Sequence, residues 1–86
     1  MRVRIPTPLR SYTGGEANVT ATGDTVAAVL ADLDRQFPGI RFRVVDEQDR
    51  LREHMTVWLD GERCRDLDAP LGGLDELVLM QALSGG

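Results

Sequence analysis

Hydrophobic and polar residues alternate in three stretches of the chain, which is the period of a strand with one buried face. These stretches are Val3–Ile5, Ala17–Ala21 and Met55–Leu59. A more continuously apolar run, Leu77–Leu83, predicts a last strand. Asp60-Gly61 is a hairpin signal, so Glu62–Arg65 is predicted to pair back as a short fourth strand.

The connection between the first two strands contains prolines and glycines. Pro6 and Pro8 cannot donate to a β-ladder, which favours a strand end or an edge strand. Thr13-Gly14-Gly15 is a turn signal. Because the connection is short, the two strands are predicted to form an antiparallel hairpin.

One helix, Thr25–Phe37, is the best-defined element of the sequence. Its apolar positions follow helical spacing and are Val26, Val29, Leu30, Leu33 and Phe37. Gly23-Asp24-Thr25 offers an N-cap at Asp24 or Thr25, and Pro38-Gly39 ends the helix.

The element order is strand, strand, helix, strand, short strand, strand, which predicts an α+β fold. One helix cannot cover both faces of such a sheet, so we expect one main helix packed on one face. Residues 40–45 fit either a short strand or a helical turn, Asp46–Glu53 is a charged connection, and Leu67–Gly73 is a loop with room for a helical turn. The domain is predicted to span residues 1–83, followed by a flexible tail of residues 84–86.

Composition excludes several kinds of chemistry. The net charge of −4 disfavours nucleic-acid binding, which needs a basic surface. The chain has no lysine, which excludes a P-loop and a lysine Schiff base of its own. One cysteine, Cys64, and one histidine, His54, cannot make a zinc or iron–sulfur ligand set, so no metal site is expected.

The same inventory predicts where the protein is found and that it does not catalyse a reaction alone. A single cysteine forms no internal disulfide, which favours a reducing cytoplasm. No apolar run has the length of a signal peptide or of a transmembrane helix, so no membrane contact is expected. Cys64 is expected to be a small packed residue and His54 a loop residue. Since no nucleophile is paired with a base, we expect no catalytic residue in this chain.

Over its whole length the sequence resembles the ubiquitin-like sulfur carriers of the ThiS/MoaD type. The residues that carry the likeness are Ile5-Pro6-Thr7-Pro8-Leu9-Arg10, Thr13-Gly14-Gly15, Gly23-Asp24-Thr25 and the final Gly85-Gly86. The first two of these motifs are more typical of the actinobacterial carrier of cysteine biosynthesis. The resemblance implies a β-grasp fold with a mixed sheet.

The resemblance also implies a reaction cycle. An E1-like partner uses ATP to adenylate the carboxylate of Gly86, and sulfur then replaces AMP to give a thiocarboxylate. In the cysteine branch, the acceptor is an activated serine derivative on a pyridoxal-phosphate-dependent cysteine synthase, and a metallopeptidase releases the new cysteine. The carrier binds no cofactor and is a protein co-substrate rather than an enzyme.

Glycine at the end of the tail has a physical reason. Without a Cβ atom, Gly85 can enter a narrow channel and adopt backbone angles closed to other residues. Gly85 and Ser84 are therefore predicted to give the tail access to a partner's active site. The stretch from Leu83 to Gly86 reaches on the order of 10–14 Å, which suits insertion into a partner's active site.

The sheet face opposite the helix is predicted to dock partners. If Val57 and Leu59 face the helix, Trp58 points away from it, and Val78 and Met80 join Trp58 by the same alternation. Tryptophan is favoured in binding hot spots, and methionine adapts to several surfaces. Arg2 and Arg4 are expected to flank this face. The alternatives are a second small core under Asp46–Glu53 or a contact between two copies of the chain.

Two other functions stay open from the sequence. One is the small subunit of molybdopterin synthase, which has the same tail, although the Ile5-Pro6-Thr7 motif favours the cysteine branch. The other is a β-grasp binding module whose terminal glycines are incidental.

Overall fold

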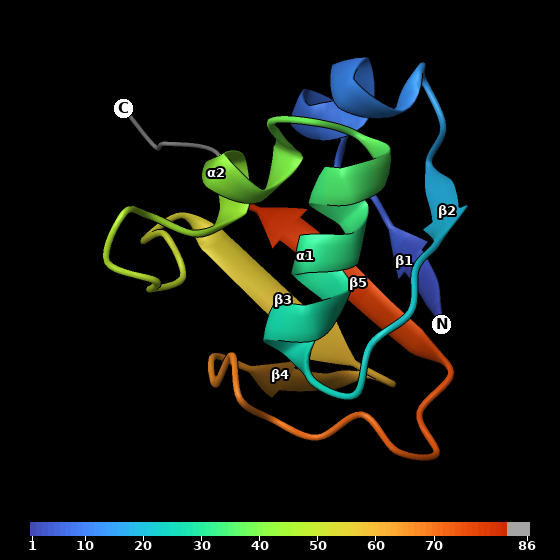
Figure 1. The fold of residues 1–86 in the computed structure, drawn as a ribbon, viewed down its shortest axis with the longest axis vertical. Helices are drawn as coiled ribbons and strands as arrows, with labels where there is room; N and C mark the ends of the chain where they lie inside the picture. Colours follow the sequence, from blue (N-terminus) through green and yellow to red (C-terminus); the bar gives the residue numbers. More distant parts are fainter. Residues whose placement is uncertain (83–86) are drawn as a thin grey trace.

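The computed structural model describes residues 1–82 and consists of a five-stranded sheet with helix α1 across one face (Figure 1). The strands are β1 (Arg2–Arg4), β2 (Asn18–Thr20), β3 (Met55–Leu59), β4 (Glu62–Cys64) and β5 (Glu76–Gln81). The helices are the 3-10 helix η1 (Thr7–Thr13), α1 (Val26–Gln36) and the short α2 (Ile40–Val44). The predicted α+β fold with one main helix on one face is confirmed.

The strand order in the sheet is β2-β1-β5-β3-β4. Strands β1 and β5 are parallel, with Val3 opposite Leu77, and the other neighbours are antiparallel, so the sheet is mixed as predicted. Strand β1 lies inside the sheet between β2 and β5. The prolines after it therefore mark the end of a strand and not an edge strand.

The antiparallel pairing of β1 with β2 is confirmed, with Val3 opposite Val19. The prediction of a short connection between these strands is wrong, because η1 occupies Thr7–Thr13 and buries Leu9. Proline fits the first turn of a helix, where its missing N–H is not needed. The prolines therefore start a helix here as well as ending a strand.

Helix α1 begins where the sequence predicts. The Ala28 N–H donates to the hydroxyl oxygen of Thr25 at 3.1 Å, so Thr25 is the N-cap. The stripe of Val26, Val29, Leu30 and Leu33 is buried in the core. Gly23 lets the chain pass close to the helix, since a Cβ atom there would lie 2.6 Å from the backbone nitrogen of Val29.

Residues 40–44 form a helix rather than a strand, which decides the alternative that the sequence left open. Leu67–Gly73 contains no helical turn. Within the described residues, the predicted last strand ends at Gln81, which pairs with Met55, the first residue of β3; Leu83, where the prediction ended, lies outside the described residues. No helix among residues 1–82 is long and apolar enough to cross a membrane.

Candidate functional site: the open sheet face and the root of the tail

The predicted reacting residue, Gly86, and the tail-access residues Gly85 and Ser84 lie outside the described residues. The structure does place the root of this tail. Strand β5 ends at Gln81, and the N–H of Ala82 donates to the backbone oxygen of His54 at 2.8 Å. This bond fixes the point at which the chain leaves the sheet, beside the start of β3 and near α2 (Figure 1).

The two faces of the central strands differ in burial. On the face covered by α1, the side chains of Val57, Leu59, Leu77 and Leu79 belong to the core. The intervening residues of β3 and β5 are only half-buried or exposed. The predicted orientation of Trp58 away from the helix is therefore confirmed.

The structure brings the predicted docking residues together on the open face. Trp58 lies directly opposite Val78 in the antiparallel pair of β3 and β5. Met80 lies two residues along β5, on the same face, opposite Thr56. Its side chain is 51% exposed, whereas Trp58 and Val78 are half-buried. The three side chains thus form one apolar patch that continues toward the tail root.

Charged residues border this patch. Arg4 lies opposite Val78 on β1, and Arg63 lies opposite Trp58 on β4. Arg2 forms an ion pair with Glu76, with 3.0 Å between its Nε atom and the carboxylate oxygen. The predicted flanking position of Arg2 and Arg4 is confirmed, although the pairing of Arg2 leaves Arg4 as the freer of the two.

The open face contains an unpartnered polar atom. The indole Nε1 of Trp58 is buried and has no hydrogen-bond partner among residues 1–82. The alternative of a second small core under Asp46–Glu53 is not supported, since Leu51 of this connection packs into the main core and Trp58 does not belong to that core. Trp58 is therefore a side chain of the sheet surface.

A groove of about 640 Å³ runs beside the patch, between β5, the end of β1 and the start of η1. Its apolar lining includes Pro6, Pro8 and Met80, and its charged lining consists of Arg4 and Arg10. From the sequence, Pro6 and Pro8 are interpreted only as signals of a strand end or an edge strand. The groove shows that they also widen the apolar surface next to Met80.

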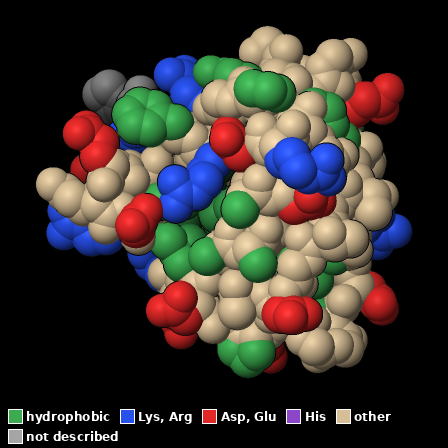
Figure 2. Space-filling model, in the orientation of Figure 1, with side chains coloured by type: hydrophobic (Ala, Val, Ile, Leu, Met, Phe, Trp, Pro, Cys, Tyr) green, Lys and Arg blue, Asp and Glu red, His purple; other side chains and the backbone are tan. Residues whose placement is uncertain are grey.

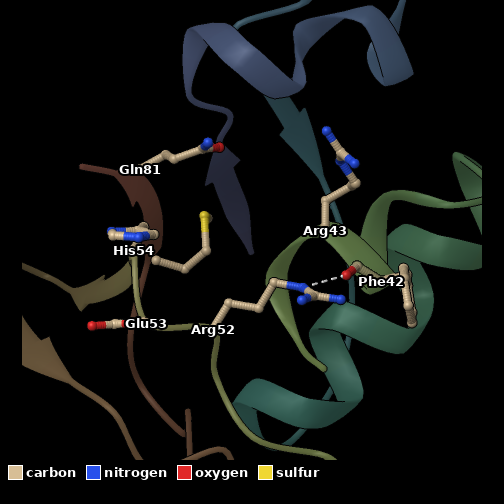
Figure 3. A pocket seen from close by; sticks show the side chains of 7 residues that line it. Phe42, Arg43, Arg52, Glu53, His54 and Gln81 are labelled. Carbon is tan, nitrogen blue, oxygen red and sulfur yellow. Dashed lines mark hydrogen bonds between the residues drawn. The ribbon is translucent and has the colours of Figure 1, made fainter. Parts of the chain in front are cut away.

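A second pocket, of about 530 Å³, lies on the other side of the tail root (Figure 3). It is lined by Phe42, Arg43, Arg52, Glu53, His54, Met55 and Gln81. The sequence did not identify this pocket, because residues 40–45 were open between strand and helix. In the helix, Ile40 and Val44 are buried one turn apart, which leaves Phe42 and Arg43 exposed.

The remaining candidate residues have minor contacts. His54 is exposed, and Cys64 is half-buried, with its Sγ atom 3.5 Å from the backbone oxygen of Asp66. No cluster of metal-ligating side chains occurs within residues 1–82. Two carboxyl groups with a lowered pKa, those of Asp32 and Asp46, lie away from the sheet face. The Thr22 N–H, with Arg35, lowers the pKa of Asp32, and the Arg50 N–H lowers that of Asp46.

Comparison with known proteins agrees with this arrangement. The model of the ThiS family matches residues 3–86. The sulfur carrier protein CysO of Mycobacterium tuberculosis (strain ATCC 25618 / H37Rv) is 34% identical over 89 residues, covering 98% of this chain and 96% of the relative.

Solved structures extend the likeness to the fold. The CysO structure of Mycobacterium tuberculosis has a TM-score of 0.88 at 32% identity, covering 95% of this chain and 98% of that one. A match to the BexX/CysO complex of Amycolatopsis orientalis has a TM-score of 0.90 at 36% identity, covering 99% of this chain and 98% of the other. The β-grasp fold and the predicted resemblance to ThiS/MoaD-type carriers are confirmed, and the chain belongs to the ThiS family.

Proposed function

We propose that this chain is a sulfur carrier for cysteine biosynthesis, with the carboxylate of Gly86 as its reacting group. The observation that carries the proposal is the family match, which continues through residue 86, together with 34% identity to a mycobacterial sulfur carrier. A match that includes the terminal glycines argues against an incidental Gly-Gly in an unrelated binding module.

The chemistry requires a partner with ATP. A free α-carboxyl group has a pKa of about 3.3–3.7, so at neutral pH it is a delocalised anion and a poor electrophile. Adenylation converts it to a mixed anhydride with AMP as leaving group, and sulfur displaces AMP to give the thiocarboxylate. The chain has no lysine for a P-loop, which supports activation by an E1-like enzyme. This chain would then be a co-substrate, without a bound cofactor of its own.

The later partners follow from the same chemistry. A thiocarboxylate sulfur is a nucleophile, so its acceptor must be an electrophile such as an activated serine derivative on a pyridoxal-phosphate-dependent cysteine synthase. The product remains attached to the carrier until a bond is hydrolysed, a role that suits a metallopeptidase. The carrier and these partners are proposed to act in the cytoplasm.

The patch of Trp58, Val78 and Met80 is proposed as the face that docks these partners. It lies on the open side of the sheet and continues to the end of β5, where the tail begins. A partner that covers the patch therefore receives the tail in its active site. The relative from Amycolatopsis orientalis is itself found in a complex with BexX, which supports docking of this fold on a partner protein.

The test uses the single cysteine of the chain. With Cys64→Ser, the protein has no thiol, so a sulfur that iodoacetamide alkylates rapidly at neutral pH after production in the native host is a thiocarboxylate, whereas the thioethers of the three methionines react slowly. We expect labelling of this variant, no labelling when Gly86→Ala is added, and none when one residue extends the chain beyond Gly86. Labelling of the extended, uncleaved protein would overturn the proposal.

A further inference from the structure

Arg52 of the pocket beside the tail root is held in place by two contacts with Phe42. Its Nε atom donates to the backbone oxygen of Phe42 at 2.7 Å, and its guanidinium carbon lies 4.7 Å from the centre of the Phe42 ring (Figure 3). Within residues 1–82, neither terminal nitrogen of Arg52 has a hydrogen-bond partner. The guanidinium group is therefore pre-oriented and still has donors to offer.

The pocket is lined by two arginines, Arg43 and Arg52, and by one carboxylate, that of Glu53. The arginines that form ion pairs within residues 1–82 are Arg2, Arg35, Arg41 and Arg50. Arg43 and Arg52 are not among them, although both line the pocket. Glu53 also lines it, but its carboxylate points away from the Arg52 guanidinium (Figure 3).

This local charge is opposite to that of the whole chain, which is −4. On the face that Figure 2 shows, acidic side chains lie along the lower edge of the molecule. The pocket lies at the other end, beside the tail root. Arginines that form no ion pair favour the approach of an acidic partner surface to this pocket.

We propose that the pocket formed by Phe42, Arg43, Arg52 and His54 receives an aspartate or glutamate side chain of the enzyme that accepts the tail. This inference rests on the proposed carrier function and names a second contact for its partners. A guanidinium fork matches the two oxygens of a carboxylate. Phe42, which is 55% exposed, offers an apolar contact beside that fork. A protein segment can use both contacts, whereas a free phosphate uses only the charge.

The probe is a blocked pentapeptide of two glutamates and three leucines, titrated into the full-length protein at low salt and followed by amide NMR shifts. We expect shifts at residues 42, 43, 52–55 and 81, absent with the matched glutamine peptide and lost at high salt. Arg52→Gln should weaken binding about fivefold, and Arg52→Lys should retain only part of the affinity. Arg35→Gln, which removes an exposed arginine of α1 away from both the pocket and the sheet face, is the control and should bind like the parent.

Three outcomes would overturn the inference. Equal binding by Arg52→Gln and the parent, with unchanged melting, would remove Arg52 from the site. AMP binding more tightly than the peptide would make it a nucleotide site. A rise in the pKa of the Gly86 carboxyl group in Arg52→Gln would place the chain's own tail in the pocket. None of these measurements requires a thiocarboxylate, so they are independent of the labelling test of the carrier function.

Discussion

Alternate residues of strands β3 and β5 point to opposite faces of the sheet. Helix α1 covers one of these faces, and the other is open. Leu77 and Leu79 lie under α1 and are at most 1% exposed. Val78 and Met80, between and after them on β5, face away from the helix, and Met80 is 51% exposed. One strand thus contributes to the core with one set of residues and to the surface with the other.

This difference shows how an 86-residue chain combines stability with recognition. A domain of this size has little core to spare, because it buries only about 60–65% of its unfolded surface. The covered face must therefore be well packed, whereas the open face is free to present apolar side chains near the tail. Substitutions on the covered face should change the free energy of unfolding, and substitutions on the open face should change binding.

The largest expected effect is from Leu33→Asp on the covered face. Leu33 is fully buried, so the carboxylate would lie in the core without a partner, and we expect a loss of about 4 kcal/mol or more. Chemical denaturation measures this loss. Ala31→Asp, on the exposed side of the same helix, is the control and should cost no more than about 1 kcal/mol. Similar losses in both variants would mean that the helix face is wrongly assigned.

A second substitution tests how closely the chain approaches α1. In Gly23→Ala, the added Cβ atom would lie 2.6 Å from the Val29 nitrogen and 2.7 Å from the Ala28 carbonyl carbon, both backbone atoms. Because backbone cannot move aside cheaply, we expect a loss of roughly 2–4 kcal/mol. Gly72→Ala has open space around the new atom and should melt like the parent. Equal melting temperatures for the two variants would contradict the close approach.

The open face is tested by Trp58→Ala combined with Met80→Ser. These residues lie outside the core, so we expect a stability loss of only about 1 kcal/mol. Binding to the enzyme that adenylates the carrier should weaken by at least about 2 kcal/mol, roughly thirtyfold. A large fall in melting temperature with unchanged binding would instead make Trp58 and Met80 structural, and the docking face would have to lie elsewhere.

The smallest effect concerns a surface carboxylate at the edge of the covered face. The Thr22 N–H and Arg35 bond to Asp32 and lower its pKa from 3.8. A group with a lowered pKa in the folded state stabilises it above the unfolded pKa, and this contribution is lost as the pH falls through the folded pKa. Asp32→Asn should therefore melt below the parent near neutral pH, and the difference should shrink below pH 3.8. A difference that stays constant into acid would contradict the assignment.

Much of the covered face could be predicted from the sequence, because backbone geometry sets how often apolar residues recur in a helix and in a half-buried strand. The spacing of Val26, Val29 and Leu33 identifies a helix, and the alternation of Val57 with Trp58 identifies a half-buried strand. Helix η1 was missed because proline both ends strands and starts helices, and single residues do not separate the two.

The candidate site was predictable only in part. Alternation placed Trp58, Val78 and Met80 together, since strand period alone decides the face. The basic pocket needed the conformation of Ile40–Val44, a stretch too short for its period to distinguish helix from strand. It also needed the contact between Arg52 and Phe42, ten residues apart, which no local pattern encodes.

The central claim is that sulfur is bound at Gly86, and the most direct measurement is fragment mass spectrometry of the protein purified from its native host. Replacement of oxygen by sulfur adds about 16 Da, which methionine oxidation also adds, so the intact mass alone does not decide. The fragment from Leu83 to Gly86 contains neither methionine nor cysteine. We predict the gain within this fragment, with its fraction reduced when the activating enzyme is deleted. An unmodified fragment in active cells, with the mass gain only at methionines, would contradict the account.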